Sequence, residues 1–251
     1  MKKTIALLLA LSMVFALCAC GGNSAPAATQ APAATEAPAA TEAPAATEAP
    51  AATEAPAEPK AEPSLLVVHK SPELTEIITS LLDRSDNMFA HALLRAIGAR
   101  DYETRGLPFM PSDLDVIGVA AVKRWLELQG IDTEPLFMRD GSGLARANKA
   151  SVNFFGDMLS MMAHRRFDGV RLCDLMPTAS DRVGKTLENN PLSSRIVLKS
   201  GSMRHVRCFV GYYPADKPRY VFAVLVNNFT CSQSSVKEQI GTFLCNLFEG
   251  K

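Results

Sequence analysis

Two short polar motifs in the sequence carry side chains able to do chemistry. Ser85-Asp86-Asn87 stands between two apolar stretches, and Lys199-Ser200-Gly201 follows 114 residues further along, at the end of another apolar stretch. A serine hydroxyl needs a base within reach before it reacts, and a lysine amine is one such base. A glycine in a strand lets a ligand approach the backbone closely. Each tripeptide alone is typical of an ordinary helix cap or turn, so the information lies in the pair and its order.

The same two motifs, in the same order, occur in penicillin-interacting serine enzymes, whose three motifs are Ser-x-x-Lys, Ser-Asp-Asn and Lys-Thr-Gly. Three longer stretches extend the resemblance: residues 85–95 (SDNMFAHALLR), residues 121–126 (AVKRWL) and residues 139–144 (RDGSGL). With them, most of residues 70–248 resembles the class C penicillin-binding proteins, the D-Ala-D-Ala carboxypeptidase/endopeptidases. Asp-Gly-Ser-Gly-Leu is the most family-specific of these pieces.

The resemblance implies a serine acyl-transfer reaction on peptidoglycan stem peptides that end in D-Ala-D-Ala. By position, Ser85 would relay a proton towards the leaving amine, Asn87 would hold the substrate amide, and Lys199 would draw in the terminal carboxylate. Ser200 replaces the threonine of the third motif while keeping a hydroxyl, and with Gly201 it would complete the substrate-binding strand. The matching Asp140 and Ser142 are expected to be structural or to lie near the rim of the site.

The nucleophile motif departs from the family pattern. In the family Ser-x-x-Lys lies upstream of Ser-x-Asn, and no such motif precedes Ser85 here. The one match in the chain, Ser234-Ser235-Val236-Lys237, is no more than chance supplies, and it falls where the family has no nucleophile. We therefore do not expect Ser234 to be catalytic, and we expect the chain to correspond to the C-terminal half of the family's fold.

The elements that must position these residues can be predicted from periodicity and capping. The pattern predicts helices over residues 71–82, 88–97 (ending at Gly98), 112–130, 151–164 and 236–248, and strands over residues 196–198, 206–213 and 220–227. Helices followed by an antiparallel run of strands and a closing helix indicate an α+β fold. Taken with the resemblance, this is an incomplete penicillin-binding/β-lactamase-like transpeptidase fold in one partial domain, residues 64–251.

The first 63 residues have the composition of an export signal and a spacer. Residues 1–20 combine Lys2 and Lys3 with an apolar run and end in Leu-Cys-Ala-Cys, which predicts a lipoprotein signal peptide lipidated at Cys20. Residues 21–63 contain an Ala-Pro-Ala-Ala-Thr-Glu repeat, in which regular prolines and the lack of large apolar side chains predict a disordered linker. We expect an exported protein, lipid-anchored to the outer face of the cell membrane or periplasmic.

Charge, histidines and cysteines narrow the function further. The 26 basic and 26 acidic residues balance over the whole chain, which argues against a nucleic-acid partner, while residues 64–251 alone are mildly basic at +3. The histidines have no metal-ligand spacing, and no motif indicates a cofactor. The cysteines of the domain are either free or paired, for instance Cys231 with Cys245, and the sequence leaves this open. These residues are His69, His91, His164, His205, Cys173, Cys208, Cys231 and Cys245.

Three functional hypotheses remain. The first is a D-Ala-D-Ala carboxypeptidase whose nucleophile comes from elsewhere, such as a partner polypeptide supplying the N-terminal half. The second is a non-catalytic cell-wall lipoprotein that keeps a remnant stem-peptide cleft. The third, a solute-binding lipoprotein, is disfavoured because a 188-residue domain is small for a two-lobed binder and because it leaves the paired motifs unexplained.

The lipid anchor gives a direct test. We expect Cys20→Ser to abolish incorporation of a clickable fatty acid into the full chain expressed in a bacterium, because the thiol is the acceptor of the lipid. Cys18→Ser, two residues earlier in the same segment, is the matched control and should keep the label. A Cys20→Ser chain that is still labelled would show that the lipid is attached elsewhere.

Overall fold

The computed structural model describes residues 68–106, 108, 110–180 and 182–251. The predicted signal peptide, Cys20 and the repeat therefore lie outside the described residues. Residues 72–251 form one compact unit, and the described residues 68–71 before it belong to a second unit and have no regular secondary structure. Within the described part of the chain, no helix has the length and apolar character needed to span a membrane.

Three antiparallel strands form the sheet, in the order β1-β2-β3. Their bounds are β1 Val197–Met203, β2 Val206–Tyr213 and β3 Tyr220–Asn227. The three predicted strands are thereby found, but the first is longer than predicted. It continues through Gly201, because each of its residues up to Met203 has a partner on β2.

Helices account for most of the rest of the described chain. The α-helices are α2 Leu74–Arg84, α3 Asn87–Arg105, α4 Leu114–Leu128, α5 Val152–Ala163, α6 Leu172–Leu175, α7 Lys185–Glu188 and α8 Gln233–Phe248. Two 3₁₀ turns, η1 Pro111–Asp113 and η2 Pro191–Ser194, complete the set. This arrangement confirms the predicted α+β class.

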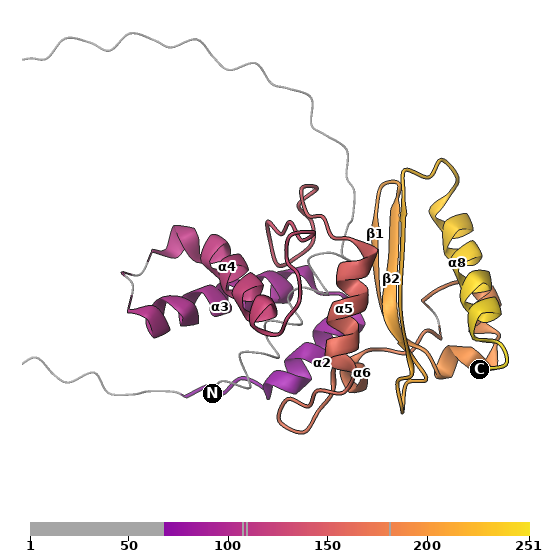
Figure 1. Cartoon of the computed structure of the whole chain (residues 1–251), viewed down its shortest axis with the longest axis horizontal. Helices are drawn as coiled ribbons and strands as arrows, with labels where there is room; N and C mark the ends of the chain where they lie inside the picture. The colour runs from indigo at the N-terminus through magenta and orange to yellow at the C-terminus, as the bar shows by residue number, and fades with distance from the viewer. Residues whose placement is uncertain (1–67, 107, 109, 181) are drawn as a thin grey trace, which may run out of the picture. The chain divides into compact units, whose positions relative to one another are not determined.

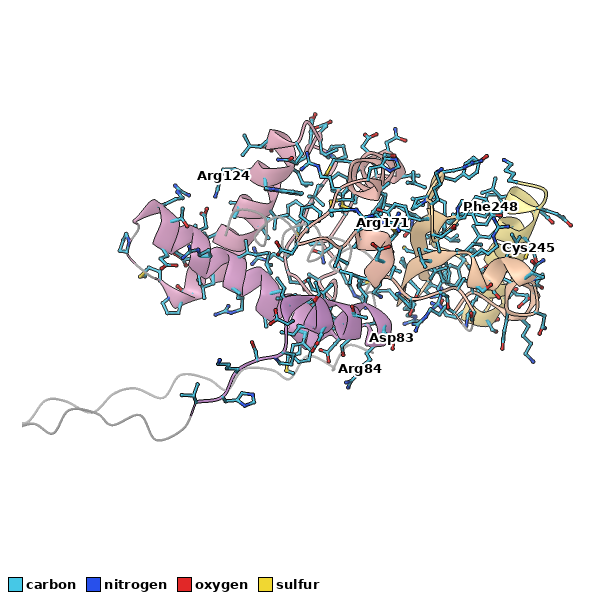
Figure 2. The ribbon with its side chains drawn as sticks, turned by 90° about the horizontal axis from the view of Figure 1, so that it is seen from below. Asp83, Arg84, Arg124, Arg171, Cys245 and Phe248 are labelled. Atoms are coloured by element: carbon cyan, nitrogen blue, oxygen red, sulfur yellow. The ribbon has the colours of Figure 1, made fainter. Side chains whose placement is uncertain are left out.

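The sheet lies between two helical layers, as Figure 1 shows, with α5 against one face and α8 against the other. We call the face towards α5 the inner face and the face towards α8 the outer face. Strand alternation separates two hydrophobic cores: Val197 and Val210 join the inner core, whereas Leu198 and Phe209 join the outer core. Figure 2 shows Cys245 and Phe248 in the α8 layer, at the opposite end of the molecule from Arg124 on α4.

The prediction that Gly98 ends a helix is wrong. Helix α3 continues to Arg105, because Gly98 is buried where α3 crosses α4, and a Cβ there would collide with the carbonyl oxygen of Leu114. Gly118 plays the same part on α4, facing the carbonyl oxygen of Leu94. The two helices thus approach too closely for any side chain at these points, and the glycines mark a helix crossing.

Three predicted helix starts also differ from the structure. Helix α2 begins at Leu74, after Glu73, so the first helix starts three residues later than the predicted residue 71. Helix α4 begins at Leu114, later than the predicted residue 112, because the 3₁₀ turn η1 leads directly into it and Asp113 makes no side-chain cap. Helix α8 begins earlier than residue 236, because the Ser232 hydroxyl accepts the N–H of Ser235 and caps it.

None of the four described cysteines is in a disulfide, so the Cys231–Cys245 pairing left open by the sequence is not formed. Cys231 is exposed, whereas Cys173, Cys208 and Cys245 are buried. Burial raises the pKa of the Cys173 and Cys245 thiols, because a thiolate is poorly solvated there.

The helix crossing generates a stability prediction. We expect Gly98→Ala to lower the free energy of unfolding by about 1–3 kcal/mol, because the new methyl group overpacks the α3–α4 contact. Gly156→Ala on α5 is the matched control, because nothing beyond the backbone of its own helix lies within 4 Å of the added Cβ. Alanine is also the better helix former, so the free energy of unfolding should rise by up to about 1 kcal/mol. Urea denaturation followed by circular dichroism measures both. Equal effects of the two substitutions would contradict the close crossing.

Candidate active site

Ser85 occupies the joint between two helices. Helix α2 ends at Arg84, and Ser85 then adopts the left-handed conformation, with φ 56° and ψ 48°. Asp86 caps the next helix, since its Oδ1 accepts the N–H of Phe89 at 3.0 Å, and α3 begins at Asn87. A positive φ is costly for a serine, so the surrounding structure must hold this joint in place.

Lys199 reaches this joint from the sheet. Its side chain is 2 % exposed and, like Val197 two residues before it, points from β1 to the inner face. The ammonium Nζ donates to Ser85 Oγ at 2.6 Å and to the carbonyl oxygen of Ser200 at 2.7 Å. The two motifs, 114 residues apart in the chain, therefore meet in direct contact.

Asn87 adds an acceptor to the site. Its Oδ1 is buried, and among the residues that the structure describes it has no hydrogen-bond partner. His91, one turn further along α3, likewise has a buried Nδ1 without a partner in the described chain, and its Nε2 lies 3.5 Å from Asp115 Oδ1. Buried polar atoms are usually paired. The first turns of α3 thus hold two buried polar atoms, on Asn87 and His91, that no described residue hydrogen-bonds.

Ser200 and Gly201 follow Lys199 along β1. Ser200 pairs with Phe209 and Gly201 with Cys208. Strand alternation points the Ser200 side chain to the opposite face from Lys199, so the contribution of Ser200 beside the amine is its carbonyl oxygen. Gly201 is buried and presents backbone alone, as expected where another group approaches a strand closely.

Asp140 organises the loop that lies against α3. Its Oδ1 accepts the N–H of Gly143 at 2.7 Å and the Nδ2 of Asn148 at 3.0 Å, and its Oδ2 accepts the N–H of Ala145 at 2.9 Å. Gly141 fits directly against α3, where a Cβ would come within 2.6 Å of the carbonyl oxygen of Ala90. The Asp-Gly-Ser-Gly segment therefore packs against α3, the helix that begins with Asn87.

Ser234 is not part of this cluster. It is exposed in the first turn of α8, and its hydroxyl shares a hydrogen bond of 2.9 Å with Ser232. Helix α8 covers the outer face of the sheet, whereas Lys199 points to the inner face. The Ser-x-x-Lys match in α8 thus lies on the opposite side of the sheet from the Lys199 side chain.

Two groups away from Ser85 and Lys199 have shifted pKa values because of their structural surroundings. Burial raises the pKa of Tyr212 well above its usual value, and its hydroxyl donates to the carbonyl oxygen of Leu159 at 3.0 Å. Hydrogen bonds from Arg171 lower the pKa of Asp174 at the start of α6. Across the described residues, no three His, Cys, Asp or Glu side chains gather as a metal site would require.

Comparison with known proteins identifies the class of protein. The model of the D-Ala-D-Ala carboxypeptidase 3 (S13) family matches residues 46–247. D-alanyl-D-alanine carboxypeptidase DacB of Haemophilus influenzae is 30% identical over 173 residues, which cover 66% of this chain and 34% of the relative. D-alanyl-D-alanine carboxypeptidase of Actinomadura sp. strain R39 is 30% identical over 171 residues, covering 65% of this chain and 30% of the relative. The chain thus spans about a third of each curated relative.

The crystal structure of penicillin-binding protein 4 (dacB) from H. influenzae has the same fold in the shared region, with a TM-score of 0.54 and 26% identity over 69% of this chain and 38% of that one. The fold and the paired motifs define a domain of the penicillin-binding class, present in part. The chain belongs to the D-Ala-D-Ala carboxypeptidase 3 (S13) family. The predicted family and fold class are thereby confirmed at this level.

The Asp140 loop generates a second stability prediction. Because one carboxylate accepts three hydrogen bonds, we expect Asp140→Ala to lower the free energy of unfolding by about 2–3 kcal/mol. Asp132→Ala is the matched control, since Asp132 accepts a single exposed hydrogen bond from Glu134, and it should cost less than about 1 kcal/mol. Denaturant titration of the full chain measures both. If Asp140→Ala costs no more than the control, the loop does not depend on this carboxylate.

Proposed function

We propose that this chain is a cell-wall lipoprotein that binds the D-Ala-D-Ala end of peptidoglycan stem peptides at Ser85, Asn87 and Lys199. In this proposal serine acyl transfer on the bound peptide requires a Ser-x-x-Lys segment contributed by a partner polypeptide. The observation that carries the proposal is the 2.6 Å contact between Lys199 Nζ and Ser85 Oγ. It joins two motifs that lie 114 residues apart in the sequence.

The chemistry of the three side chains supports stem-peptide binding. An ammonium group attracts a terminal carboxylate, and a charge-assisted hydrogen bond is about twice as strong as a neutral one. Asn87 Oδ1 is a buried acceptor without a partner among the described residues, so an amide N–H of the peptide would satisfy it. Ser200 and Gly201 offer backbone beside the amine, where an extended peptide can lie along β1.

The proposed reaction assigns one role to each group. The serine of the partner's Ser-x-x-Lys attacks the carbonyl carbon of the D-Ala-D-Ala bond, while the lysine of that motif takes the serine proton. The C–N bond of the tetrahedral intermediate then breaks, and Ser85 relays the proton from that lysine to the leaving amine of D-alanine. The acyl group stays on the partner's serine as an ester, which water hydrolyses to release the shortened peptide. Lys199, within hydrogen-bond reach of Ser85, holds the substrate carboxylate and favours proton release from the hydroxyl.

A second candidate is a non-catalytic binder that keeps the cleft. It is favoured by the sequence, in which no Ser-x-x-Lys precedes Ser85, and by the place of Ser234 on the other side of the sheet. Both candidates share peptide binding and differ in acyl transfer alone.

The finer assignments belong to the same proposal. These are membership of class C, a lipoprotein signal over residues 1–20 with lipid at Cys20, a spacer over residues 21–63 and the partial domain over residues 64–251. The lipobox-like Leu-Cys-Ala-Cys and the proline-containing repeat support them. An anchored, tethered domain would act on the outer side of the cell membrane or in the periplasm, where stem peptides are found.

Binding tests the shared part of the proposal. We expect the full chain to bind a diacetyl-Lys-D-Ala-D-Ala peptide in calorimetry, and Lys199→Ala to weaken binding by about tenfold to a hundredfold, as expected for loss of a hydrogen bond to a charged group. Lys217→Ala, at an exposed lysine between β2 and β3, is the matched control and should bind as the unaltered chain does. The same peptide ending in L-Ala-L-Ala should bind weakly. Equal affinity in the Lys199→Ala and Lys217→Ala chains would rule out the cleft.

Labelling with a fluorescent penicillin separates the two candidates. The chain alone should give no covalent band under either candidate, because the acylated serine is not its own. A band that disappears in Ser234→Ala would overturn the assignment of Ser234 as an ordinary surface residue. A band that appears when a Ser-x-x-Lys polypeptide is added would favour the enzyme over the non-catalytic binder.

A further inference from the structure

Basic side chains gather at the end of the sheet where β1 turns into β2. Arg204 is exposed in the turn of this hairpin, and Arg207 is half-buried near the start of β2. Arg146 and Lys149 are exposed on the loop that follows the Asp-Gly-Ser-Gly segment. We call these four residues the basic end. In the described part of the chain, none of the four forms an ion pair with a carboxylate.

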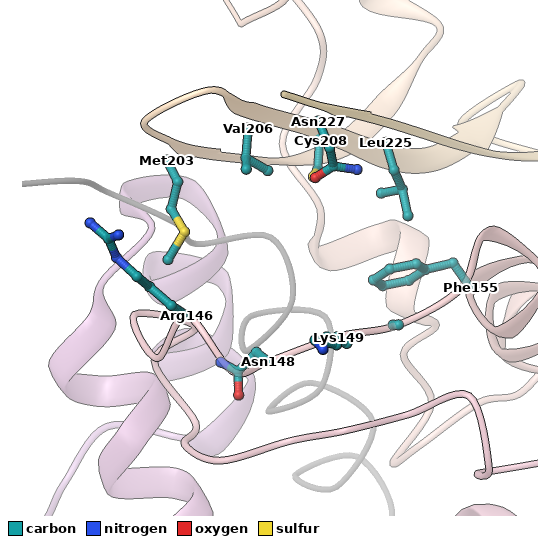
Figure 3. A pocket seen from close by; sticks show the side chains of 10 residues that line it. Arg146, Asn148, Lys149, Phe155, Met203, Val206, Cys208, Leu225 and Asn227 are labelled. Atoms are coloured by element: carbon teal, nitrogen blue, oxygen red, sulfur yellow. The ribbon is translucent and has the colours of Figure 1, made fainter. Parts of the chain in front are cut away.

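The loop and the hairpin face each other across a cavity of about 300 Å³ on the inner face of the sheet. Figure 3 shows Arg146 and Lys149 on the loop side, and Met203 and Val206, which flank the hairpin turn, on the sheet side. No acidic residue is among the described residues that line this cavity. Because Arg204 directly follows Met203, the positive charges of the loop and of the hairpin lie at the same end of the sheet.

Arg207 extends the positive charge to the outer face. It points to the same face as Phe209, and its guanidinium carbon lies 5.1 Å from the centre of the Phe209 ring. Its Nε is buried, and no described residue accepts a hydrogen bond from it. Burial lowers the pKa of the Arg207 guanidinium, since the charged form is poorly solvated there. Charged groups that are withdrawn from water are usually paired, so an anion at this end of the sheet would supply a missing partner.

We propose that the basic end binds a flexible anionic polymer of the cell wall whose repeating unit is a polyol phosphate. Each phosphodiester carries a negative charge, and arginine binds phosphate oxygens through two parallel hydrogen bonds. The hydroxyl groups of the polyol also have a partner, because Asn227 is exposed at the end of β3 and lines the same cavity. The ligand class is thus set by unpaired positive charge together with a neutral amide.

The placement of the charges favours a flexible chain over a flat lipid surface. Arg146 and Lys149 lie at the inner cavity, whereas Arg207 points to the outer face. A polymer can bend round the hairpin turn and contact both faces, but a bilayer surface contacts one side of the hairpin at a time.

This inference goes beyond the proposed function and shares with it the cell-wall location alone. It uses none of the side chains assigned to the D-Ala-D-Ala peptide, which are Ser85, Asn87 and Lys199. Binding at the basic end would keep the domain close to the wall while the peptide site stays free.

Binding of the full chain to poly(glycerol phosphate) tests the proposal. The probe is a fluorescently labelled chain of about ten units, and its anisotropy reports binding. We expect the affinity to fall at least about tenfold between about 0.01 M and about 1 M salt, since the Debye length falls from about 30 Å to about 3 Å. Single glycerol phosphate, at the same total phosphate concentration, should compete at least about tenfold less well than the unlabelled polymer, because it contacts one cation at a time.

A pair of double variants locates the contact. Arg146→Glu with Lys149→Glu should weaken polymer binding at least about tenfold, because two attractions become repulsions. Lys217→Glu with Arg219→Glu changes the net charge equally and is the matched control. These two residues are exposed in the turn between β2 and β3, at the opposite end of the strands, so the control should bind within about twofold of the unaltered chain.

Two further variants test the hairpin. Arg204→Glu should weaken binding about tenfold, whereas Arg204→Lys, which keeps the charge, should bind as the unaltered chain does. Arg207→Met keeps a long side chain over the Phe209 ring and removes the charge. It should weaken polymer binding at least about threefold without lowering stability in urea, a combination that loss of folding cannot produce.

Three results would overturn the proposal. The first is that the polymer does not bind at low salt. The second is an equal loss of affinity in the two double variants, which would reduce the effect to net charge. The third is that Arg146→Glu with Lys149→Glu lowers binding to phosphatidylglycerol vesicles as much as binding to the polymer, which would make a lipid surface the partner. This double variant should leave D-Ala-D-Ala binding unaltered, so a chain that binds the polymer but not the dipeptide would refute the proposed function alone.

Discussion

The buried ammonium group of Lys199 is the constraint on which the site depends. A charge removed from water is costly unless hydrogen bonds replace its hydration. Lys199 is 2 % exposed, and its Nζ donates to Ser85 Oγ and to the carbonyl oxygen of Ser200. Ser85 lies in the joint between α2 and α3, so this one group ties the helical layer to the first strand of the sheet. If the joint moved, the charge would lose a partner.

Much of the surrounding structure holds that joint in place. Helix α3 crosses α4 at Gly98 and Gly118, where neither helix carries a side chain, and the Asp140 loop presses Gly141 against the first turns of α3. These contacts hold α3 on two sides and keep its first residue, Asn87, next to Ser85. Burying the unpaired Oδ1 of Asn87 lowers the stability of the fold, and the packing of α3 elsewhere compensates for this loss. A buried oxygen of this kind remains able to accept a hydrogen bond from a ligand.

Local sequence patterns predicted which segments are helices and which are strands more accurately than they predicted the first and last residue of each element. The α+β class, the three strands and the main helices were evident from periodicity. The end of α3 was missed because Gly98, a helix stop by its local propensity, serves a crossing with α4. Strand β1 was predicted too short because Gly201 weakens the strand pattern, whereas pairing with β2 carries the strand through it. In both cases a tertiary contact overrode a local preference.

The sequence by itself determined the family, because the order and spacing of motifs can be read without a structure. The motifs are Ser85-Asp86-Asn87, Lys199-Ser200-Gly201 and the Asp-Gly-Ser-Gly-Leu segment. It also showed that β3 is apolar at six successive positions. Only the tertiary structure decided that Ser85 and Lys199 touch, that Ser234 and Lys199 lie on opposite faces of the sheet, and that β3 is an edge strand of the described sheet. The reason is physical: local propensity acts over a few residues, whereas a contact across 114 residues is set by how whole elements pack.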